Sequence, residues 1–169
     1  MRTGTEEAQS PKYAHIERER RWLVDPALRP KLDALPYILI EDRYISGTRL
    51  RLRRMTDSAT GNQSLKLTKK YECADPLARP IVTSYLTLEE YSVLAMLDAK
   101  PLTKRRYKVD GFSIDCFEDA LVGLELSEIE WPDDEGLRAL QSPIWSVADV
   151  SDNPQYQGGS LVSLGKPKD

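Results

Sequence analysis

The chain has 169 residues, of which 40% are hydrophobic and 30% are charged, and its formal net charge is -3. This length fits one domain that can bury a core, and the near balance of 24 basic and 27 acidic residues argues against a duplex-binding protein, which would show a basic excess. Two cysteines are too few for a disulfide framework, so Cys73 and Cys116 are expected to be reduced thiols.

The two ends of the chain are expected to be tails around a single domain. Residues 1–12 lack the apolar core of a secretory signal. We expect a disordered tail over 1–12, one domain over 13–165 and a short tail over 166–169. No apolar run in the sequence approaches the ~20 residues of a membrane span. The interpretation is a cytoplasmic protein without a membrane partner, present as a monomer or a homodimer.

Alternating residues and turn signals predict a chain dominated by strands. Gly61-Asn62 and Asp110-Gly111 suit the turns of two hairpins, so most neighbouring strands are expected to be antiparallel. The expected strands lie in segments 16–24, 37–45, 48–55, 64–72, 82–86, 104–111, 112–119 and 124–131.

Helices are expected at four places, which makes the class α+β. The dipeptide Asp25-Pro26 supplies an N-cap and a first helical position, and predicts a short helix over 27–35. The clearest signal is the capping box of Thr87 and Glu90, which opens a helix over 86–99 with its apolar residues in one stripe. Two further helices are expected at 133–140 and 155–164.

In several strands the charged residues share one face, because successive side chains of a strand point to opposite sides. An ordinary one-sided sheet would also alternate apolar and polar residues. Exposed faces usually mix signs, however, and three arginines in a row repel one another unless an anion lies over them. The charged faces comprise Glu17, Glu19 and Arg21; Arg49, Arg51 and Arg53; Lys66; Lys104, Arg106 and Lys108; Asp115; and Glu128 and Glu130. Parity with Lys66 favours Lys70 over Lys69 as a member of the same face.

If the sheet closes with these faces inward, one interior holds an acidic and a basic cluster together. Carboxylates without histidine or cysteine suit a hard cation such as Mg²⁺ or Mn²⁺, and arginine and lysine suit phosphate oxygens. The two sets together predict a site for a metal-bound polyphosphate. The sole histidine, His15, is expected at a strand edge, and the sequence has no Ser-His-Asp pattern, zinc-ligand spacing or glycine-rich phosphate loop.

Seven motifs and a C-terminal segment, in order over about residues 13–161, resemble the CYTH superfamily, the triphosphate tunnel metalloenzymes. They are IERERRWLV, TRLRLR, LKLTKK, LTLEEY, LTKRRY, FSIDCF, LSEIEW and PIWSVADVS, the last followed by Tyr156. The resemblance implies a closed eight-stranded antiparallel β-tunnel with flanking helices, which binds a triphosphate together with a divalent metal.

The resemblance also implies roles for the charged residues at matching positions. The expected metal ligands are Glu17, Glu19, Asp115, Glu128 and Glu130. The expected phosphate-binding residues are Arg49, Arg51, Arg53, Lys66, Lys104 and Arg106. The expected catalytic residues are Glu17, Glu19 and Arg21. Two departures stand out: Arg21 occupies a position where the family usually has lysine, and segment 79–86 lacks the acidic residues that many relatives carry there.

Members of this superfamily include inorganic triphosphatases, thiamine triphosphatases and class IV adenylyl cyclases. The expected function is metal-dependent hydrolysis of a small-molecule triphosphate, most simply inorganic tripolyphosphate to pyrophosphate and phosphate. One alternative is an adenylyl cyclase that converts ATP to cyclic AMP and pyrophosphate. Another is a non-catalytic polyphosphate- or nucleotide-binding module, suggested by Arg21 and the few acidic residues. Nucleic acid is not expected as a partner, because the basic residues are interleaved with a strong acidic set.

Overall fold

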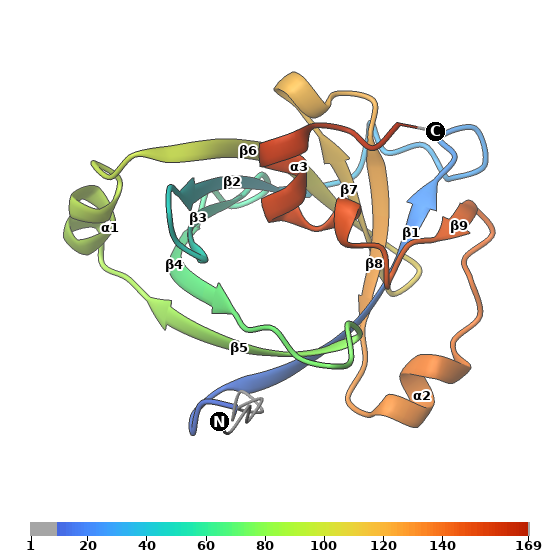
Figure 1. The fold of residues 1–169 in the computed structure, drawn as a ribbon. Coiled ribbons are helices and arrows are strands. Elements are labelled where there is room, and N and C mark those ends of the chain that lie inside the picture. The colour runs from blue at the N-terminus through green and yellow to red at the C-terminus, as the bar shows by residue number, and fades with distance from the viewer. Residues whose placement is uncertain (1–9, 169) are drawn as a thin grey trace, which may run out of the picture.

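The computed structural model describes residues 10–168, and Figure 1 shows their fold. Residues 1–9 of the expected N-terminal tail and residue 169 of the expected C-terminal tail lie outside the described residues. The elements in chain order are β1 (His15–Val24), β2 (Tyr37–Ile45), β3 (Leu50–Asp57), β4 (Gln63–Lys70), β5 (Ala78–Tyr85), α1 (Leu88–Leu94), β6 (Ala99–Val109), β7 (Phe112–Phe117), β8 (Glu125–Glu130), α2 (Asp134–Ala139), β9 (Ser146–Asp149) and α3 (Gly158–Leu164), with 3-10 turns at Asp119–Leu121 and Pro154–Tyr156.

Eight of the strands in the described part of the chain close into a barrel (Figure 1). The order around the ring is β5-β4-β3-β2-β6-β7-β8-β1, and residues 15–18 of β1 pair with β5 to close it. All of these pairs are antiparallel. The α+β class and the closed eight-stranded tunnel with flanking helices that the sequence predicted are therefore confirmed.

The register of the barrel keeps the charged faces together on its inner side. Glu19 of β1 lies opposite Glu130 of β8, and Arg106 of β6 lies opposite Asp115 of β7. Directly opposed residues of an antiparallel pair lie on the same face of the sheet. Because this holds strand by strand, the acidic and basic faces that alternate in the sequence meet in one interior.

Connecting segments cover much of the outer face of the barrel. Leu32, in the connection after β1, and Trp145, just before β9, pack against Tyr107 and Ile114 on the outer side of β6 and β7. Each such side chain, when fully buried, contributes roughly 1.5–3 kcal/mol relative to exposure. A hydrophobic layer outside the barrel thus stabilises strands whose inner faces carry charge.

Three of the four expected helices are present, and one is not. Thr87 and Glu90 form the capping box that begins α1, as predicted, although α1 ends at Leu94. The helix expected over 27–35 is wrong: this segment forms only isolated turns. Pro30 lacks an amide donor and disfavours helical geometry in the residue before it, and the Asp25 carboxylate accepts the amide of Ala27 in a local turn instead.

A ninth strand was not predicted from the sequence. β9 pairs with residues 22–24 at the end of β1, beyond the part of β1 that pairs with β5. Its four residues are too few for a period-of-two pattern to be distinguished from a loop. The strand brings the C-terminal segment to the barrel, where Val150 donates its amide to the carbonyl of Arg21.

The C-terminal segment packs across part of one end of the barrel. Leu161 of α3 is 2% exposed and packs with Leu102, Phe117 and Leu126, which lie on three successive strands. Figure 1 shows α3 lying beside β6 and β7 at this end. The interior is therefore apolar where Leu161 packs.

We expect Gly158→Ala to loosen this packing. A Cβ atom at Gly158 would lie 1.8 Å from the Tyr44 hydroxyl oxygen, so α3 or Tyr44 must move. Overpacking of this kind costs roughly 1–3 kcal/mol, which corresponds to a fall in melting temperature of about 2–12 °C for a chain of this size. Gly159→Ala is the matched control, because its Cβ meets nothing within 4 Å. Equal melting temperatures for the two variants would contradict this account of the packing.

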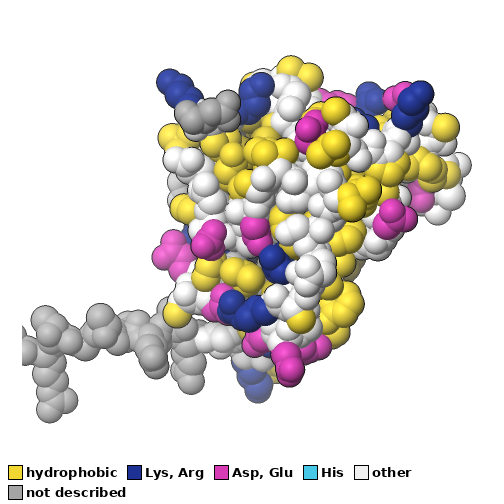
Figure 2. All heavy atoms as spheres, turned by 90° about the vertical axis from the view of Figure 1, so that its right-hand side faces the viewer, with side chains coloured by type: hydrophobic (Ala, Val, Ile, Leu, Met, Phe, Trp, Pro, Cys, Tyr) yellow, Lys and Arg dark blue, Asp and Glu magenta, His cyan; other side chains and the backbone are white. Residues whose placement is uncertain are grey.

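The outside of the molecule differs from its interior in charge pattern. Figure 2 shows acidic and basic side chains interspersed with apolar ones on the face that lies to the right in Figure 1. No helix among the described residues is long and apolar enough to cross a membrane.

Both cysteines are free, and burial raises the pKa of the Cys116 thiol to about 12. Cys116 is therefore a poor nucleophile.

Candidate functional site

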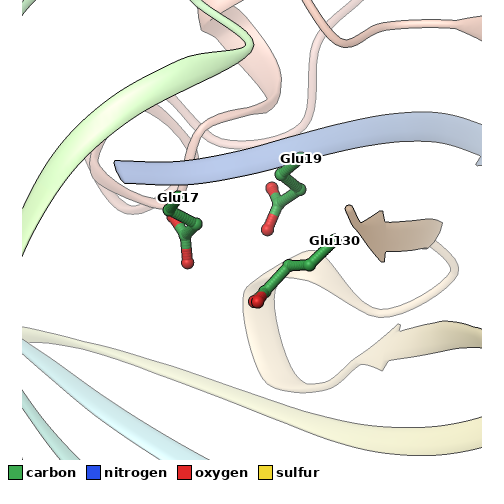
Figure 3. Close-up of side chains that lie close together, drawn as sticks. All are labelled: Glu17, Glu19 and Glu130. Atoms are coloured by element: carbon green, nitrogen blue, oxygen red, sulfur yellow. The ribbon is translucent and has the colours of Figure 1, made fainter. Parts of the chain in front are cut away.

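Three glutamates from two neighbouring strands gather inside the barrel. Glu17 and Glu19 alternate along β1, and Glu130 ends β8 directly opposite Glu19. One carboxylate oxygen from each residue lies within 4.8 Å of the other two, and Figure 3 shows the three side chains converging. We call these three residues the carboxylate cluster. It follows directly from the period of two on β1 and from the antiparallel register with β8.

A cavity of about 230 Å³ lies on one side of the carboxylate cluster and is strongly basic. Its wall is formed by β1 to β5, the connection before β5 and the start of α3. The charged residues that line it are Glu17, Glu19, Arg21, Arg49, Arg51, Lys70 and Arg79. Five basic and two acidic side chains give this first cavity a formal charge of +3, which suits a polyanion.

Arg51 is the cation of the first cavity that is most available to a ligand. Its Nε is buried without a hydrogen-bond partner, and no carboxylate of residues 10–168 forms an ion pair with it. By contrast, Lys70 is paired with Glu17, and Arg49 pairs with the exposed Glu72 at 2.7 Å. An unpaired arginine aimed into a cavity is costly unless an anion or water satisfies it.

A second layer of ion pairs fills the barrel beyond the first cavity. Arg21 bonds Glu19 at 2.6 Å and Glu128 at 2.9 Å, and Arg106 bonds Glu128 at 2.5 Å. Arg106 also holds both oxygens of Asp115, at 2.6 and 2.7 Å. Asp115, with no exposed surface, also accepts a bond from Lys104. Of the five expected metal ligands, three thus form the carboxylate cluster, whereas Asp115 and Glu128 are held by arginine and lysine.

Arg21 also reaches the C-terminal segment. Its Nη1 donates to the carbonyl of Tyr156 at 2.8 Å, in addition to its bonds to Glu19 and Glu128. Three nitrogens of one planar guanidinium serve three partners in different directions. A lysine ammonium is a single point charge on a flexible stem and does not offer this fixed fork. The arginine at this position therefore links the C-terminal segment to the acidic residues.

The surroundings give the carboxylates different pKa values. Burial raises the pKa of Glu19, and the charge of Glu128 adds to the rise, although Arg21 opposes it. Burial also opposes the ionisation of Glu17, yet Lys70 and Arg51 together lower its pKa. Glu19 is thus a carboxylate whose ionised form is disfavoured by its surroundings, and an added cation would favour that form.

A second cavity, of about 220 Å³, lies on the other side of Glu19. Glu19 lines both cavities, Glu17 lines only the first, and Glu130 lines only the second. The charged residues of this second cavity are Glu19, Arg106, Lys108, Glu128 and Glu130, with a formal charge of -1. The carboxylate cluster therefore stands between a basic and an acidic space.

Four of the six expected phosphate-binding residues do not line the first cavity: Lys104 and Arg106 are held by Asp115 and Glu128, and Arg53 and Lys66 also have other partners. Arg53 makes two bonds to Asp42, at 2.6 and 2.7 Å, and both side chains are buried. Lys66 lies with its Nζ 5.1 Å from the centre of the Tyr85 ring. Neither residue lines the first or the second cavity. Lys70 lines the first cavity, as parity favoured.

Two interior residues were missed in the sequence. Asp42 shares a face of β2 with Ile40 and Tyr44, so the alternation in YILIEDRYI could have indicated that its side chain faces the interior. Arg79 opposes Glu17 across β5 and β1 and donates to Gln157 at 2.9 Å. Arg79 lies in the segment noted for its lack of acidic residues, in which a basic residue was not considered.

The donor set of the cluster fits a hard divalent cation. It offers carboxylate oxygens from three residues, with no histidine or thiol. Mg²⁺ and Mn²⁺ prefer oxygen ligands, and Mg²⁺ often retains several waters beside one or two carboxylates. Among the residues that the structure describes, this is the one such group of three or more potential ligands.

Solved structures share this fold at low sequence identity. Two crystal structures of the protein NE1496, described in one as a hypothetical protein and in the other as an inorganic triphosphatase, match with TM-scores of 0.55 and 0.54 at 22% and 20% identity. Each covers 86% of this chain, and the matches span 97% and 93% of those chains. The PH1819 protein from Pyrococcus horikoshii OT3 matches at 18% identity with a TM-score of 0.51, over 72% of this chain and 84% of its own.

No protein-family model matches the sequence, and no curated protein matches it either. At 18–22% identity the structural likeness establishes the fold. The closed eight-stranded tunnel expected from the sequence motifs is thereby confirmed as an architecture.

Proposed function

We propose that this protein is a divalent-metal-dependent triphosphatase whose simplest substrate is inorganic tripolyphosphate. The observation that carries the proposal is the +3 cavity with an unpaired Arg51, which adjoins the carboxylate cluster. A polyanion and a divalent cation are the two ligands that these neighbouring sites suit. The likeness to a fold for which one member is described as an inorganic triphosphatase supports the same reaction.

In this proposal the basic residues of the first cavity hold the phosphate chain. Arg51 and Arg79 donate from β3 and β5, and Arg49 donates near the exposed rim. Charge-assisted hydrogen bonds to phosphate oxygens are shorter and stronger than neutral ones. The incoming polyanion also offers Lys70 a partner other than Glu17, so Glu17 becomes available as a ligand.

The carboxylate cluster holds the metal, with Glu17 facing the first cavity, Glu130 facing the second, and Glu19 between them. Bound Mg²⁺ or Mn²⁺ supplies charge neutralisation of the phosphate oxygens and an oriented water. Arg21 then stabilises the charge that develops on the phosphate oxygens in the transition state, because its guanidinium is fixed by Glu128 and Tyr156.

Phosphate release from a small substrate panel tests the proposal. Tripolyphosphate, thiamine triphosphate and ATP are each incubated with the protein, with MgCl₂ or MnCl₂, and again with a chelator. We expect metal-dependent release of phosphate, fastest from tripolyphosphate. Cyclic AMP and pyrophosphate as the products from ATP would show the cyclase reaction instead. Tight tripolyphosphate binding without hydrolysis under either metal would point to a non-catalytic binding module.

We expect Arg51→Ala to weaken tripolyphosphate binding about 10- to 100-fold in metal-free buffer. A hydrogen bond to a charged group contributes roughly 1.5–3 kcal/mol, and Arg51 has no carboxylate partner that the substitution would leave unpaired. The melting temperature should therefore change little. Titration calorimetry measures the affinity, and Arg54→Ala is the matched control.

Arg54 lies three residues farther along β3 than Arg51 but faces outward, with its Cζ 5.0 Å from the centre of the Tyr91 ring. Its substitution should leave the affinity for tripolyphosphate within about twofold of wild type. Equal affinities for the two variants would contradict the assignment of the first cavity as the phosphate site.

A further inference from the structure

The first and second cavities meet at Glu19 and carry opposite net charge. The first cavity lies toward the end of the tunnel near α3, and the second lies toward the β6–β7 hairpin. The first cavity is rimmed by Arg49, whose side chain is 45% exposed, and has a formal charge of +3. The second cavity reaches the β6–β7 hairpin at Gly111 and has a formal charge of -1. A ligand approaching the carboxylate cluster therefore meets a different potential on each side.

We propose that the second cavity is the entrance for the divalent cation, separate from the polyphosphate entrance through the first cavity. This inference rests on the proposed metal site. A cation is repelled by the five basic residues of the first cavity and attracted by the acidic residues of the second. Glu130 lines only the second cavity and is the most exposed member of the cluster. Glu130 is thus the first carboxylate of the cluster that a cation would reach by this route.

Lys108 is the residue that controls this entrance. It is the last inward-facing residue of β6 before the hairpin, it is exposed, and it lines the second cavity. Its ammonium donates to the Ser113 hydroxyl at 2.7 Å, and it has no carboxylate partner among residues 10–168. Arg106, the other cation of this cavity, is already held by Asp115 and Glu128. Lys108 therefore carries the uncompensated positive charge that an incoming cation must pass.

A separate cation entrance has a consequence for the order of binding. Phosphate in the first cavity does not close the second cavity, so the cation can reach Glu19 and Glu130 before or after the polyphosphate binds. Water can reach the cluster by the same route. Since in-line displacement needs the attacking and leaving oxygens on opposite sides of the phosphorus, a phosphate chain on one side of the cluster and water on the other suit that geometry.

The test measures the association rate of Mn²⁺ with the protein in the absence of polyphosphate. Stopped-flow competition with a fluorescent metal indicator gives this rate without any need for turnover. We compare wild type with Lys108→Glu, Arg49→Glu and Lys31→Glu, three reversals of one positive charge. Lys31 is exposed and lines none of the cavities described, so its variant controls for net charge.

Lys108→Glu is expected to speed Mn²⁺ association about fivefold to tenfold at 10 mM ionic strength, and about threefold at 0.1 M, because salt screens the added attraction. Lys108→Ala should show a smaller increase, and Arg49→Glu and Lys31→Glu should stay within about twofold of wild type. An increase for Arg49→Glu equal to or greater than that for Lys108→Glu would overturn the proposal, as would no increase for Lys108→Glu or no Mn²⁺ binding at all.

Steady-state phosphate release is assayed separately, so failure of the cation route and failure of the triphosphatase proposal are distinguished. A protein that hydrolyses tripolyphosphate but takes up Mn²⁺ through the first cavity would refute the separate entrance alone. If Lys108→Glu speeds Mn²⁺ association but tripolyphosphate is not hydrolysed, the result would support the separate cation entrance and contradict the proposed triphosphatase activity.

Discussion

Glu19→Gln is expected to lower kcat for tripolyphosphate about a hundredfold to a thousandfold. Glu19 is the member of the carboxylate cluster that lines both cavities, and glutamine keeps its size while removing the charge that holds a cation. Loss of one fixed electrostatic group at the reacting centre has an effect of this order in other enzymes. Initial rates of phosphate release with saturating MgCl₂ measure it.

Glu19→Gln should change the stability of the metal-free protein little. Because burial and Glu128 raise the pKa of Glu19, ionisation of Glu19 costs the folded state stability as pH rises through the ordinary carboxyl range. Glutamine removes this cost but also removes the ion pair of Glu19 with Arg21, which keeps Glu128 as its carboxylate partner, so the melting temperature at pH 7 should change little. Glu118→Gln, which removes an ion pair with Arg105 outside the tunnel, is the control. Full turnover in Glu19→Gln would contradict the assigned site.

Asp115→Asn is expected to destabilise the fold by about 3–5 kcal/mol. Asp115 has no exposed surface and holds both Lys104 and Arg106. Removing one charge from a buried ionic group leaves its partners uncompensated, and the cost is of this size. For a chain of this length the fall in melting temperature should be roughly 6–20 °C. Asp134→Asn removes an exposed ion pair with Arg18 and should cost at most about 1 kcal/mol.

The cost of Asp115→Asn should depend on pH in a defined direction. Burial opposes ionisation of Asp115 and also lowers the pKa of the Lys104 ammonium, but Arg106 and Lys104 together lower the pKa of Asp115. A lowered carboxyl pKa gives stability that is complete above the ordinary carboxyl range and is lost as pH falls through the lowered value. The difference in melting temperature between wild type and variant should therefore narrow below about pH 4. A constant difference down to pH 2 would show that the carboxylate charge is not the cause.

Much of the architecture could be predicted because alternation specifies which side of a strand faces inward. The charged faces of β1, β3, β6 and β8 all face the interior, since a strand cannot rotate one residue without exposing its apolar side. The turn at Asp110-Gly111 was equally clear, and both residues have positive φ there, 48° and 83°. The prediction of a helix failed where a proline interrupts the segment. With Pro30 in segment 27–35, the apparent N-cap at Asp25 forms an isolated turn instead of beginning a helix.

The partners of the site residues could not be predicted from alternation. Parity gives the face of Arg53, but only the register between β2 and β3 brings Asp42 beside it. The same limit applies to Asp115, which was expected among the metal ligands and instead forms ion pairs with Lys104 and Arg106. The position of a side chain along the tunnel depends on the stagger between strands around the closed ring, and this stagger cannot be predicted from the alternation of a single sequence.

The packing of the C-terminal segment illustrates another limit. The bonds from Arg21 to Tyr156 and from Arg79 to Gln157 join residues that are 135 and 78 positions apart. Nothing in the local pattern of either segment indicates such contacts. Arg21, noted in the sequence as a departure from the usual lysine, has a structural reason: its guanidinium reaches the C-terminal segment and two carboxylates at once.

The most direct measurement is anomalous X-ray diffraction from crystals soaked with MnCl₂ and an imido-bridged tripolyphosphate analogue. The account predicts a manganese peak bound by Glu17, Glu19 and Glu130, with the phosphate chain in the first cavity against Arg51 and Arg79. A manganese peak elsewhere, or a phosphate chain bound outside the first cavity, would contradict it.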